Sequence, residues 1–258
     1  MTNYKLLVDT AALAGEIMLS SGAETYRVED TMYHILKTSE SKAIEALALL
    51  TGIIVTVNDE TMEQPLTVMK TINDRVTNMK NIIKVNDISR RYCSGNISLE
   101  EAYTELQKVR GKVHNRTLYN LATVGIGVGF AMMLGGKSAE LIMTILVGAL
   151  LAAIMTVGKI AKWSGIFVNA FGGLEIAFLT MLFQRLLFPN LNADIVIVAA
   201  IMPIVPGVAI TNAIRDTLQG DYLSGCGRML EAFLTAASVA VGIGLGMIVA
   251  NGIIGGVL

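Results

Sequence analysis

Five long apolar stretches follow one another in the C-terminal part of this chain. Each is long enough to cross a bilayer as a helix, which takes about 20 mainly apolar residues. Charged residues avoid this part, because the chain has 20 Lys or Arg and 21 Asp or Glu but residues 117–258 contain only six of each. A membrane protein with about five spanning helices is therefore predicted. The predicted spans are residues 118–134, 139–157, 166–188, 193–213 and 229–250.

The N-terminal residues have a different character and predict a soluble domain. They carry most of the charges, and their apolar residues follow the periods of helices and strands. We expect an α-helical polytopic membrane protein with an N-terminal cytoplasmic α+β domain, residues 1–112, before a transmembrane domain, residues 113–258. In the first domain the predicted helices are 4–20, 24–39, 74–92 and one from Ser98, where Glu101 completes a capping box, and the predicted strands are 51–57 and 65–72.

The N-terminus is predicted to stay in the cytoplasm. Asp9 and Glu16 interrupt the first apolar stretch and no basic segment precedes it, so the start is not a signal peptide. Basic residues beside the spans favour one side of the membrane by eight to two, which predicts a multi-pass cell-membrane protein with an external C-terminus. The eight are Lys108, Arg110, Lys112, Arg116, Lys159, Lys162, Arg215 and Arg228, and the two are Lys137 and Arg185.

Several classes of function are disfavoured by composition. The net charge of −1 gives no basic face dense enough to bind nucleic acid. Cys93 and Cys226 have no metal-ligand spacing, which predicts neither a disulfide nor a metal site. His34 and His114 belong to no catalytic motif, and the sequence has no phosphate-binding loop. We therefore expect no enzymatic activity, no cofactor and no ATP-driven transport by this chain.

Polar and helix-breaking residues inside two predicted spans indicate a pathway. The third span contains Asn169 and Glu175, and an ionisable residue at membrane depth is costly unless it faces a partner, water or a pathway. A structural hydrogen bond is the alternative. In the fourth span, Pro203, Pro206 and Gly207 should break the helix. Broken helices form binding sites in transporters, although a plain proline kink explains the same residues.

Small residues recur at four-residue spacing in three predicted spans. Such ladders let helix backbones approach closely in lipid, where packing drives association. We expect them to pack the bundle rather than to bind a ligand. They are Gly125 and Gly129, Ala149 and Ala153, and Ala232, Ala236, Ala240 and Gly244.

Two segments resemble the signature segments of a known family. The first is SGAETYRVEDTM at residues 21–32, and the second is MPIVPGVAITNAIRDTLQGDYLSG at residues 202–225. Both are similar to segments of the threonine/serine exporter family, in its N-terminal-half form. The resemblance covers nearly the whole chain and implies a subunit of a secondary transporter. Such a subunit exports small polar metabolites, namely threonine and serine or small dicarboxylates such as succinate.

The resemblance also implies a partner. Fused members of the family continue into a second membrane half, whereas this sequence ends after its fifth predicted span, so we expect the split form with a second small multi-span membrane subunit. The lipid bilayer and a homo-oligomer are the other partners considered. The alternative function is a membrane-tethered enzyme with a hydrolase-like cytoplasmic domain, and a third option is a scaffold or sensor.

Candidate site residues follow from the resemblance, position by position. They add to Asn169 and Glu175 a set of pathway residues and a cytoplasmic motif. The added pathway residues are Pro203, Pro206, Gly207, Thr211, Asn212, Arg215 and Asp216, and the cytoplasmic motif is Gly22, Glu24, Arg27 and Glu29.

The roles of the charged candidates remain open between two interpretations each. Glu24 and Arg27 suit a surface ion pair on one helix, or a helix start that docks on the membrane half and gates its inner mouth. Arg215 suits two-pronged binding of a substrate carboxylate, or it pairs with Asp216 at the interface. Burial disfavours the charged form of Glu175, which either takes up a proton that drives export or pairs with Arg215.

Overall fold

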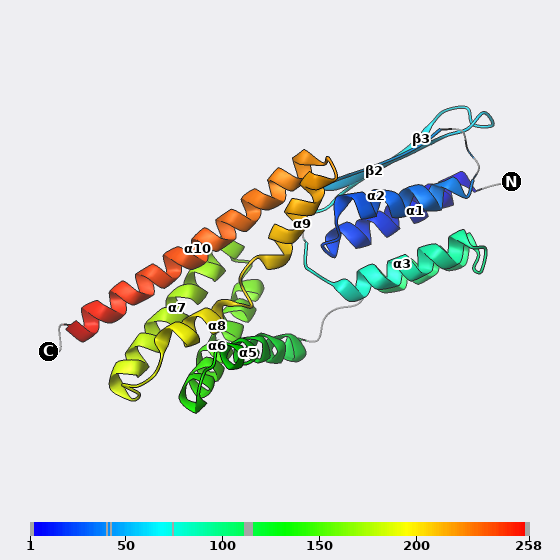
Figure 1. The fold of residues 1–258 in the computed structure, drawn as a ribbon. Coiled ribbons are helices and arrows are strands. Elements are labelled where there is room, and N and C mark those ends of the chain that lie inside the picture. The colour runs from blue at the N-terminus through cyan, green and yellow to red at the C-terminus, as the bar shows by residue number, and fades with distance from the viewer. Residues whose placement is uncertain (1–2, 40, 42, 74, 111–115, 256–258) are drawn as a thin grey trace. The chain divides into compact units, whose positions relative to one another are not determined.

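The computed structural model describes residues 3–39, 41, 43–73, 75–110 and 116–255. The chain is mostly helical and forms two compact units (Figure 1). The first unit comprises Met1–Val113 and Val208–Leu230, and the second comprises His114–Gly207 and Glu231–Leu258. The predicted domain boundary at residues 112 and 113 lies outside the described residues, as does His114.

The first unit contains a three-stranded antiparallel sheet in the order β1-β2-β3. Its strands are β1 (Ala43–Leu49), β2 (Gly52–Asn58) and β3 (Leu66–Thr71). The predicted strand pair is confirmed as β2 and β3, with Val55 opposite Val68. Strand β1 is not predicted from the sequence, because its residues, AIEALAL, are rich in Ala, Leu and Glu, which favour helices.

Four helices accompany this sheet. They are α1 (Tyr4–Ser20), α2 (Thr25–Lys37), α3 (Met79–Cys93) and α4 (Leu99–Arg110). The predicted capping box at the start of α4 is confirmed, because the Ser98 N–H donates to the Glu101 carboxylate at 2.8 Å and the Glu101 N–H donates to the Ser98 hydroxyl at 3.2 Å. The predicted start of α3, residue 74, lies outside the described residues.

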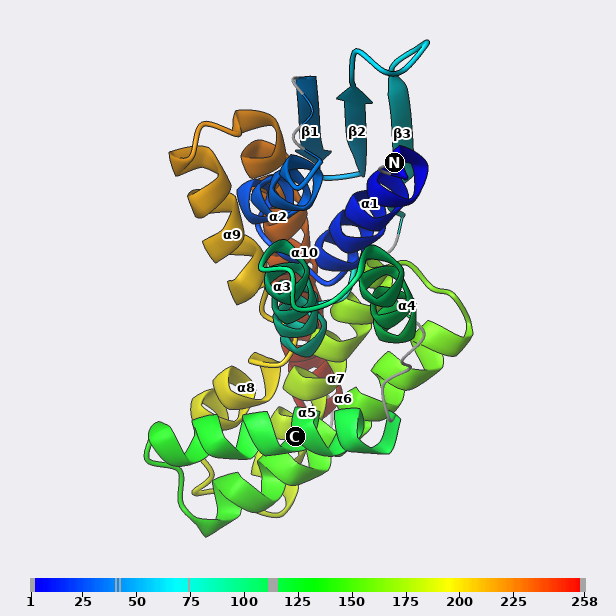
Figure 2. The same cartoon turned by 90° about the vertical axis from the view of Figure 1, so that its right-hand side faces the viewer.

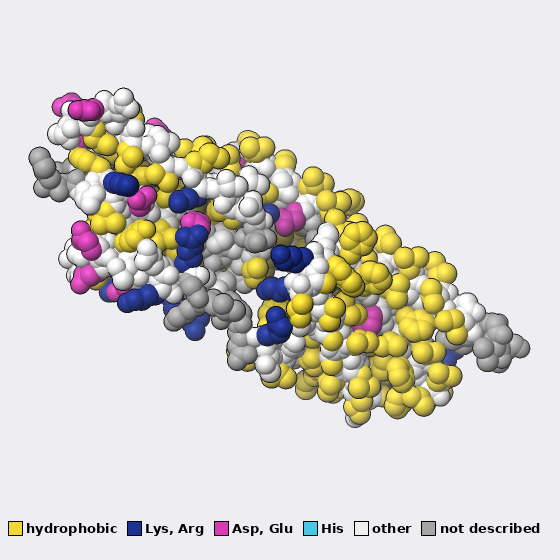
Figure 3. Space-filling model, turned by 180° about the vertical axis from the view of Figure 1, so that it is seen from behind, with side chains coloured by type: hydrophobic (Ala, Val, Ile, Leu, Met, Phe, Trp, Pro, Cys, Tyr) yellow, Lys and Arg dark blue, Asp and Glu magenta, His cyan; other side chains and the backbone are white. Residues whose placement is uncertain are grey.

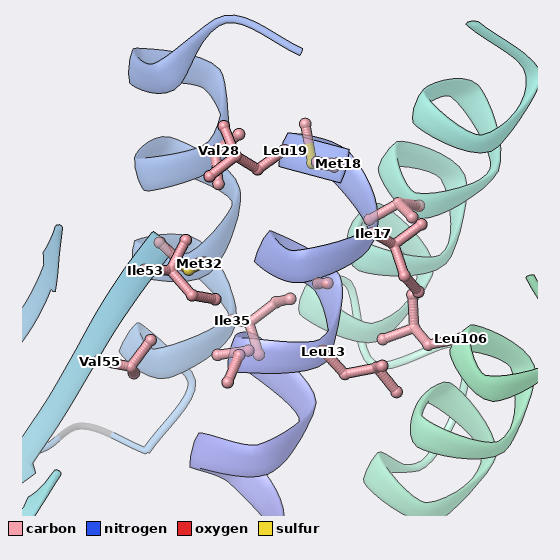
Figure 4. Close-up of a cluster of buried hydrophobic side chains, with 14 of the residues drawn as sticks. Leu13, Ile17, Met18, Leu19, Val28, Met32, Ile35, Ile53, Val55 and Leu106 are labelled. Carbon is pink, nitrogen blue, oxygen red and sulfur yellow. The ribbon is translucent and has the colours of Figure 1, made fainter. Parts of the chain in front are cut away.

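The core of the first unit lies between α1, α2 and the sheet. Helices α1 and α2 lie on one face of the sheet (Figure 2). Ile17 of α1, Met32 of α2 and Ile53 of β2 are almost fully buried, and Leu106 joins them from α4 (Figure 4). The helical period of the apolar residues in α1 and α2 therefore directs both helices onto this core.

Two helical segments from the C-terminal half complete the first unit. They are most of α9 (Gly207–Leu218) and the first turns of α10 (Tyr222–Gly255). A turn joins them, in which Gly220 adopts a φ of +90°, a value that favours glycine. The helices approach closely at Gly225, because an added Cβ there would lie 3.1 Å from the Ala213 carbonyl oxygen.

The second unit is a bundle of apolar helices. It contains α5 (Arg116–Met133), α6 (Ser138–Ile160), α7 (Gly165–Leu186), α8 (Ala193–Ile201) and the rest of α10. Val147, Ile176 and Val196 are fully buried in its core. Many large apolar side chains face outward, and Figure 3 shows them over most of the face that it draws of this unit. An apolar exterior suits helices that pack in lipid.

Close helix packing in the second unit occurs at other glycines than the predicted ladders. An added Cβ at Gly173 of α7 would lie 2.6 Å from the Val239 carbonyl oxygen of α10, and Gly242 meets the backbone of Ala170. Three glycines of the predicted ladders, Gly125, Gly129 and Gly244, make no such contact with the described part of this chain, because an added Cβ there meets no described atom within 4 Å. On α10, the glycine that packs closely, Gly242, lies two residues from Gly244 of the predicted ladder and therefore on a different face of the helix.

Three helices among the described residues are long and apolar enough to cross a membrane. They are α6, α7 and residues Tyr222–Ile253 of α10. The predicted break in the fourth apolar stretch is confirmed, because α8 ends at Ile201 and α9 begins at Gly207. The chain is thus a helical protein of membrane character with a small sheet, and the count of five spans stays a prediction.

Candidate functional site

The two signature segments meet inside the first unit. The turn between α1 and α2 supplies Glu24 and Thr25, and α9 supplies Asn212 and Asp216. All four side chains are buried, and so is that of Arg228, from the first turns of α10. Because segments about 190 residues apart in sequence contribute, a buried polar network holds α9 and α10 to this turn.

The backbone of the turn is shaped to receive these side chains. Gly22 has a φ of +81°, which glycine adopts without strain. Asn212 donates from its amide to the Gly22 carbonyl at 2.9 Å, and Arg228 donates to the Ala23 carbonyl at 2.7 Å. The backbone carbonyl groups of the turn thereby obtain donors from α9 and α10.

Asp216 joins α9 to both α2 and α10. Its carboxylate accepts from the Thr25 N–H at 3.2 Å and from the Thr25 hydroxyl at 2.9 Å, so it caps the start of α2. Its other oxygen lies 2.9 Å from Nε of Arg228. Asp216 is 0% exposed and Arg228 is 5% exposed. Burial raises the pKa of Asp216, and Arg228 and the bonds from Thr25 offset part of that rise.

The predicted pairing of Arg215 with Asp216 is wrong. Consecutive helix residues point about 100° apart, so Asp216 faces the interior while the Arg215 side chain is 58% exposed. Arg215 instead donates to the Glu24 carboxylate, which raises the pKa of Arg215 above its usual range. The alternative pairing of Arg215 with Glu175 would join the two units and stays a prediction.

The predicted ion pair between Glu24 and Arg27 is confirmed in part. Nε of Arg27 lies 3.8 Å from one oxygen of Glu24, and the Arg27 side chain is 50% exposed. Glu24 is not a surface residue, however, since its side chain is only 6% exposed. The buried Glu24 carboxylate thus pairs with both Arg27 and Arg215.

Glu29 of the cytoplasmic motif lies away from this pair. It accepts from the Ala48 N–H at 2.9 Å and so ties α2 to strand β1. Partial burial raises the pKa of Glu29, with a smaller contribution from the acidic side chains Asp221 and Asp216, while the Ala48 bond opposes the rise.

The other predicted pathway residues lie outside this network. Thr211 lies one turn before Arg215 on the exposed side of α9. Pro203 and Pro206 belong to the break between α8 and α9, in the second unit together with Gly207 and α7. The structure therefore brings some residues of the two signature segments together, namely Gly22, Glu24, Thr25, Asn212, Arg215 and Asp216, but not the prolines of the break.

Glu175 lies in the middle of α7 and is 8% exposed. Neither of its carboxylate oxygens has a hydrogen-bond partner among the described residues. One turn earlier, Gly172 packs near Ile204, a residue of the break, since an added Cβ would lie 3.8 Å from its Cδ1. Asn169, six residues before Glu175, is half-buried on α7.

Two further buried charges were missed from the sequence. Glu140 of α6 accepts from the Lys137 N–H at 2.8 Å and from the Asn192 N–H at 2.9 Å, so it caps one helix and fixes the approach to another. Its three-residue spacing from Lys137 is the pattern of a capping box and offered a signal. The sequence around Arg228 gives no comparable signal, because its partner Asp216 lies on another helix.

A comparison with known proteins identifies the family. Residues 9–250 match the model of the family described as "Putative threonine/serine exporter". The chain belongs to the threonine/serine exporter family. The "Probable threonine/serine exporter" of Mycobacterium tuberculosis (strain ATCC 25618 / H37Rv) is 23% identical over 241 residues. That match covers 92% of this chain and 45% of the relative, so the chain spans less than half of the relative's length.

Membership of the threonine/serine exporter family favours a membrane transporter rather than an enzyme. No solved structure matches the chain. The match over residues 9–250 includes both signature segments, residues 21–32 and 202–225, and also Arg228, so it covers every residue of the buried network. The network and Glu175 therefore lie within the residues that match the family model.

Proposed function

We propose that this chain is a subunit of a secondary transporter that exports small polar metabolites, threonine and serine or small dicarboxylates, across the cell membrane. The family match over residues 9–250 carries this proposal. The apolar exterior of the second unit supports it, because such helices are stable in lipid. The alternative of a membrane-tethered hydrolase gains no support, since His34 contacts only Asp30 among the interactions described for its ring nitrogens.

Glu175 is the coupling residue in this proposal. A buried carboxylate without a partner is costly when charged, so the neutral acid is the favoured form in the resting protein. Opening of a pathway to water would let Glu175 exchange its proton. Inward movement of that proton would then drive the substrate outward.

The break between α8 and α9 is the substrate site in this proposal. Pro203 and Pro206 lack backbone donors, and irregular backbone at membrane depth is tolerated only inside protein or beside a water-filled cavity. Gly172, one turn from Glu175, packs near Ile204 of this break. Substrate and proton would therefore meet in one region of the second unit.

We also propose that a second small multi-span membrane subunit completes the exporter. The chain matches 45% of the length of the mycobacterial relative. A second subunit would correspond to the part of that relative which this chain does not match. We expect purified chain alone to transport poorly. Robust efflux from liposomes that hold only this chain would contradict this part, as would a homo-oligomer with full activity.

The proposed orientation has the N-terminus in the cytoplasm and the C-terminus outside. It rests on the eight-to-two distribution of basic residues beside the predicted spans. A reporter enzyme fused after Leu258 measures it directly. Activity of a periplasm-specific reporter there is expected, whereas activity of a cytoplasm-specific reporter would contradict the five-span arrangement.

Metabolite export from vesicles tests the function itself. Inverted membrane vesicles with this chain and its partner subunit would be compared with vesicles that lack either one, using radiolabelled L-threonine, L-serine and succinate. We expect accumulation of at least one of the three that collapses when the proton gradient is removed. Equal accumulation in vesicles without this chain would refute the proposal.

A further inference from the structure

Helix α9 has its polar side chains inside and its apolar side chains outside. Asn212 and Asp216 are buried against the first unit, whereas Ile214 and Leu218 lie on the opposite face and are exposed. Ile210, one turn before Ile214, is exposed on the same face. The outward face of α9 therefore carries an apolar row at four-residue spacing.

The first turns of α10 repeat this inverted arrangement. Ser224 and Arg228 are buried, whereas Tyr222 is 67% exposed and Leu223 is 71% exposed. Leu218, at the end of α9, is 79% exposed. The exposed apolar residues of both helices form what we call the outer strip. It comprises Ile210, Ile214, Leu218, Tyr222 and Leu223.

Helix α2 of the same unit has the arrangement of a helix that faces water. It buries Val28, Met32 and Ile35 and exposes Asp30 and Lys37. The outer strip has the reverse arrangement, and exposed apolar patches mark sites of contact with a protein or a membrane. The strip is therefore an interaction surface rather than a face that water covers.

The course of α10 favours lipid as the partner. The helix is unbroken over 34 residues, whereas about 20 residues cross the hydrocarbon core, so about 14 of its residues lie outside that core. Residues Tyr222–Ile253 are apolar enough throughout to belong to a span. Met229 and Phe233, at seven and eleven residues after Tyr222, are exposed on the same face as Tyr222. The outer strip thus continues into the outward face of the span.

We propose that the outer strip inserts into the lipid–water interface of the membrane and that the α9–α10 hairpin thereby anchors the first unit to the bilayer surface. Amphipathic helices bind at this depth, with their apolar face between headgroups and acyl chains. Tyr222 suits this depth because it has an apolar ring and a polar hydroxyl group. Residues 214–228, between the fourth and fifth predicted spans, are therefore held at the membrane surface.

Tryptophan fluorescence of the full chain in lipid nanodiscs tests this insertion. Trp163 is the single tryptophan of the sequence, so Leu218→Trp and Tyr222→Trp are each made together with Trp163→Phe. Both new side chains take exposed positions, where a larger ring disturbs no packing. We expect lipids brominated near the headgroup end of the acyl chain to quench both variants, and more strongly than lipids brominated near the methyl end.

Met69→Trp in the same background is the matched control. Met69 is 67% exposed on β3, two strands away from β1 in the sheet of the same unit. Dissolved iodide should quench this variant, and brominated lipids should not. Val241→Trp, at an exposed position in the fifth predicted span, is the reference for the hydrocarbon core. Bromines near the methyl end should quench it more strongly.

Quenching of Leu218→Trp and Tyr222→Trp by iodide as strong as that of Met69→Trp would place the strip in water and overturn the inference. Stronger quenching by bromines near the methyl end would place it in the hydrocarbon core and contradict the interfacial depth. Shielding from iodide without quenching by either lipid would also overturn the inference, because a second copy of this chain would then cover the strip. None of these outcomes depends on which metabolite is exported, so the proposed function is tested separately.

Discussion

Asp216 in the first unit and Glu175 in the second are both buried carboxylates, but their surroundings differ. Asp216 lies 2.9 Å from Arg228 and accepts two hydrogen bonds from Thr25. Glu175 has no hydrogen-bond partner among the described residues. A buried charge with partners holds helices in place, whereas a buried carboxyl group without partners is costly when it is charged.

The two units also pack by different means. In the first, large side chains such as Met32 and Leu106 fill the space between helices and sheet. In the second, α7 and α10 touch through backbone at Gly173 and Gly242. Large side chains use the hydrophobic effect, which acts in water, whereas close backbone contact is effective in lipid. The packing thus agrees with one unit in water and the other in the membrane.

The largest effect is expected from removing Arg228. Arg228→Met leaves Asp216 buried without its cation, which should destabilise the first unit by about 3–5 kcal/mol. Hydrogen exchange of the α2 amides near Thr25, in the full chain in nanodiscs, would measure the loss of protection. The double variant Arg228→Met with Asp216→Asn should lose less, because no buried charge remains unpaired.

Arg91→Met provides the comparison for this prediction. The Arg91–Glu105 ion pair is partly exposed, and such pairs contribute little to stability because solvent screens them. If Arg228→Met lost no more protection than Arg91→Met, the buried network would not be what holds α9 and α10 to the first unit.

A smaller effect is expected from adding one methyl group between α7 and α10. The Cβ of Gly173→Ala would lie 2.6 Å from the Val239 carbonyl oxygen, so the helices must separate, at about 1–3 kcal/mol. Gly244→Ala on α10 meets no described atom within 4 Å and serves as the control. Thermal unfolding in detergent should show a lower midpoint for Gly173→Ala alone. Equal midpoints would mean that the two helices do not pack at Gly173.

The smallest effect concerns Glu29. Because the pKa of Glu29 is raised in the folded state, the folded state binds more protons than the unfolded state above the ordinary value of 4.5. Stability therefore falls as pH rises through the window between the two pKa values. Glu29→Gln keeps an acceptor for the Ala48 N–H and should gain about 0.5 kcal/mol at neutral pH.

The pH profile of hydrogen exchange in β1 checks the Glu29 prediction. The difference in protection between Glu29→Gln and the unsubstituted protein should grow from about pH 4 to about pH 7. A constant difference over this range would show that Glu29 has the same pKa in the folded and unfolded states.

Local features of the structure could be predicted from the sequence because local residues determine them. Two prolines stop α8 wherever α8 packs, and the capping box of Ser98 and Glu101 needs only its own helix. The strands β2 and β3 were predicted from β-branched runs, and the signature segments led to the candidate residues.

Features that depend on distant residues could not be predicted. Asp216 meets Arg228 only because the turn at Gly220 folds α10 back along α9. Arg215 meets Glu24 rather than its sequence neighbour because α9 packs against the turn between α1 and α2. Strand β1 has helix-favouring residues and becomes a strand because β2 lies beside it.

Proton-coupled export by Glu175→Gln tests the central claim most directly, because the amide mimics the protonated acid but cannot release a proton. Proteoliposomes with both subunits would be assayed for L-threonine efflux driven by a pH gradient and, separately, for exchange of L-threonine at equal pH. The account predicts that gradient-driven efflux is lost while exchange is retained. Gradient-driven efflux with an unchanged pH dependence in Glu175→Gln would contradict it and leave Glu175 as a packing residue.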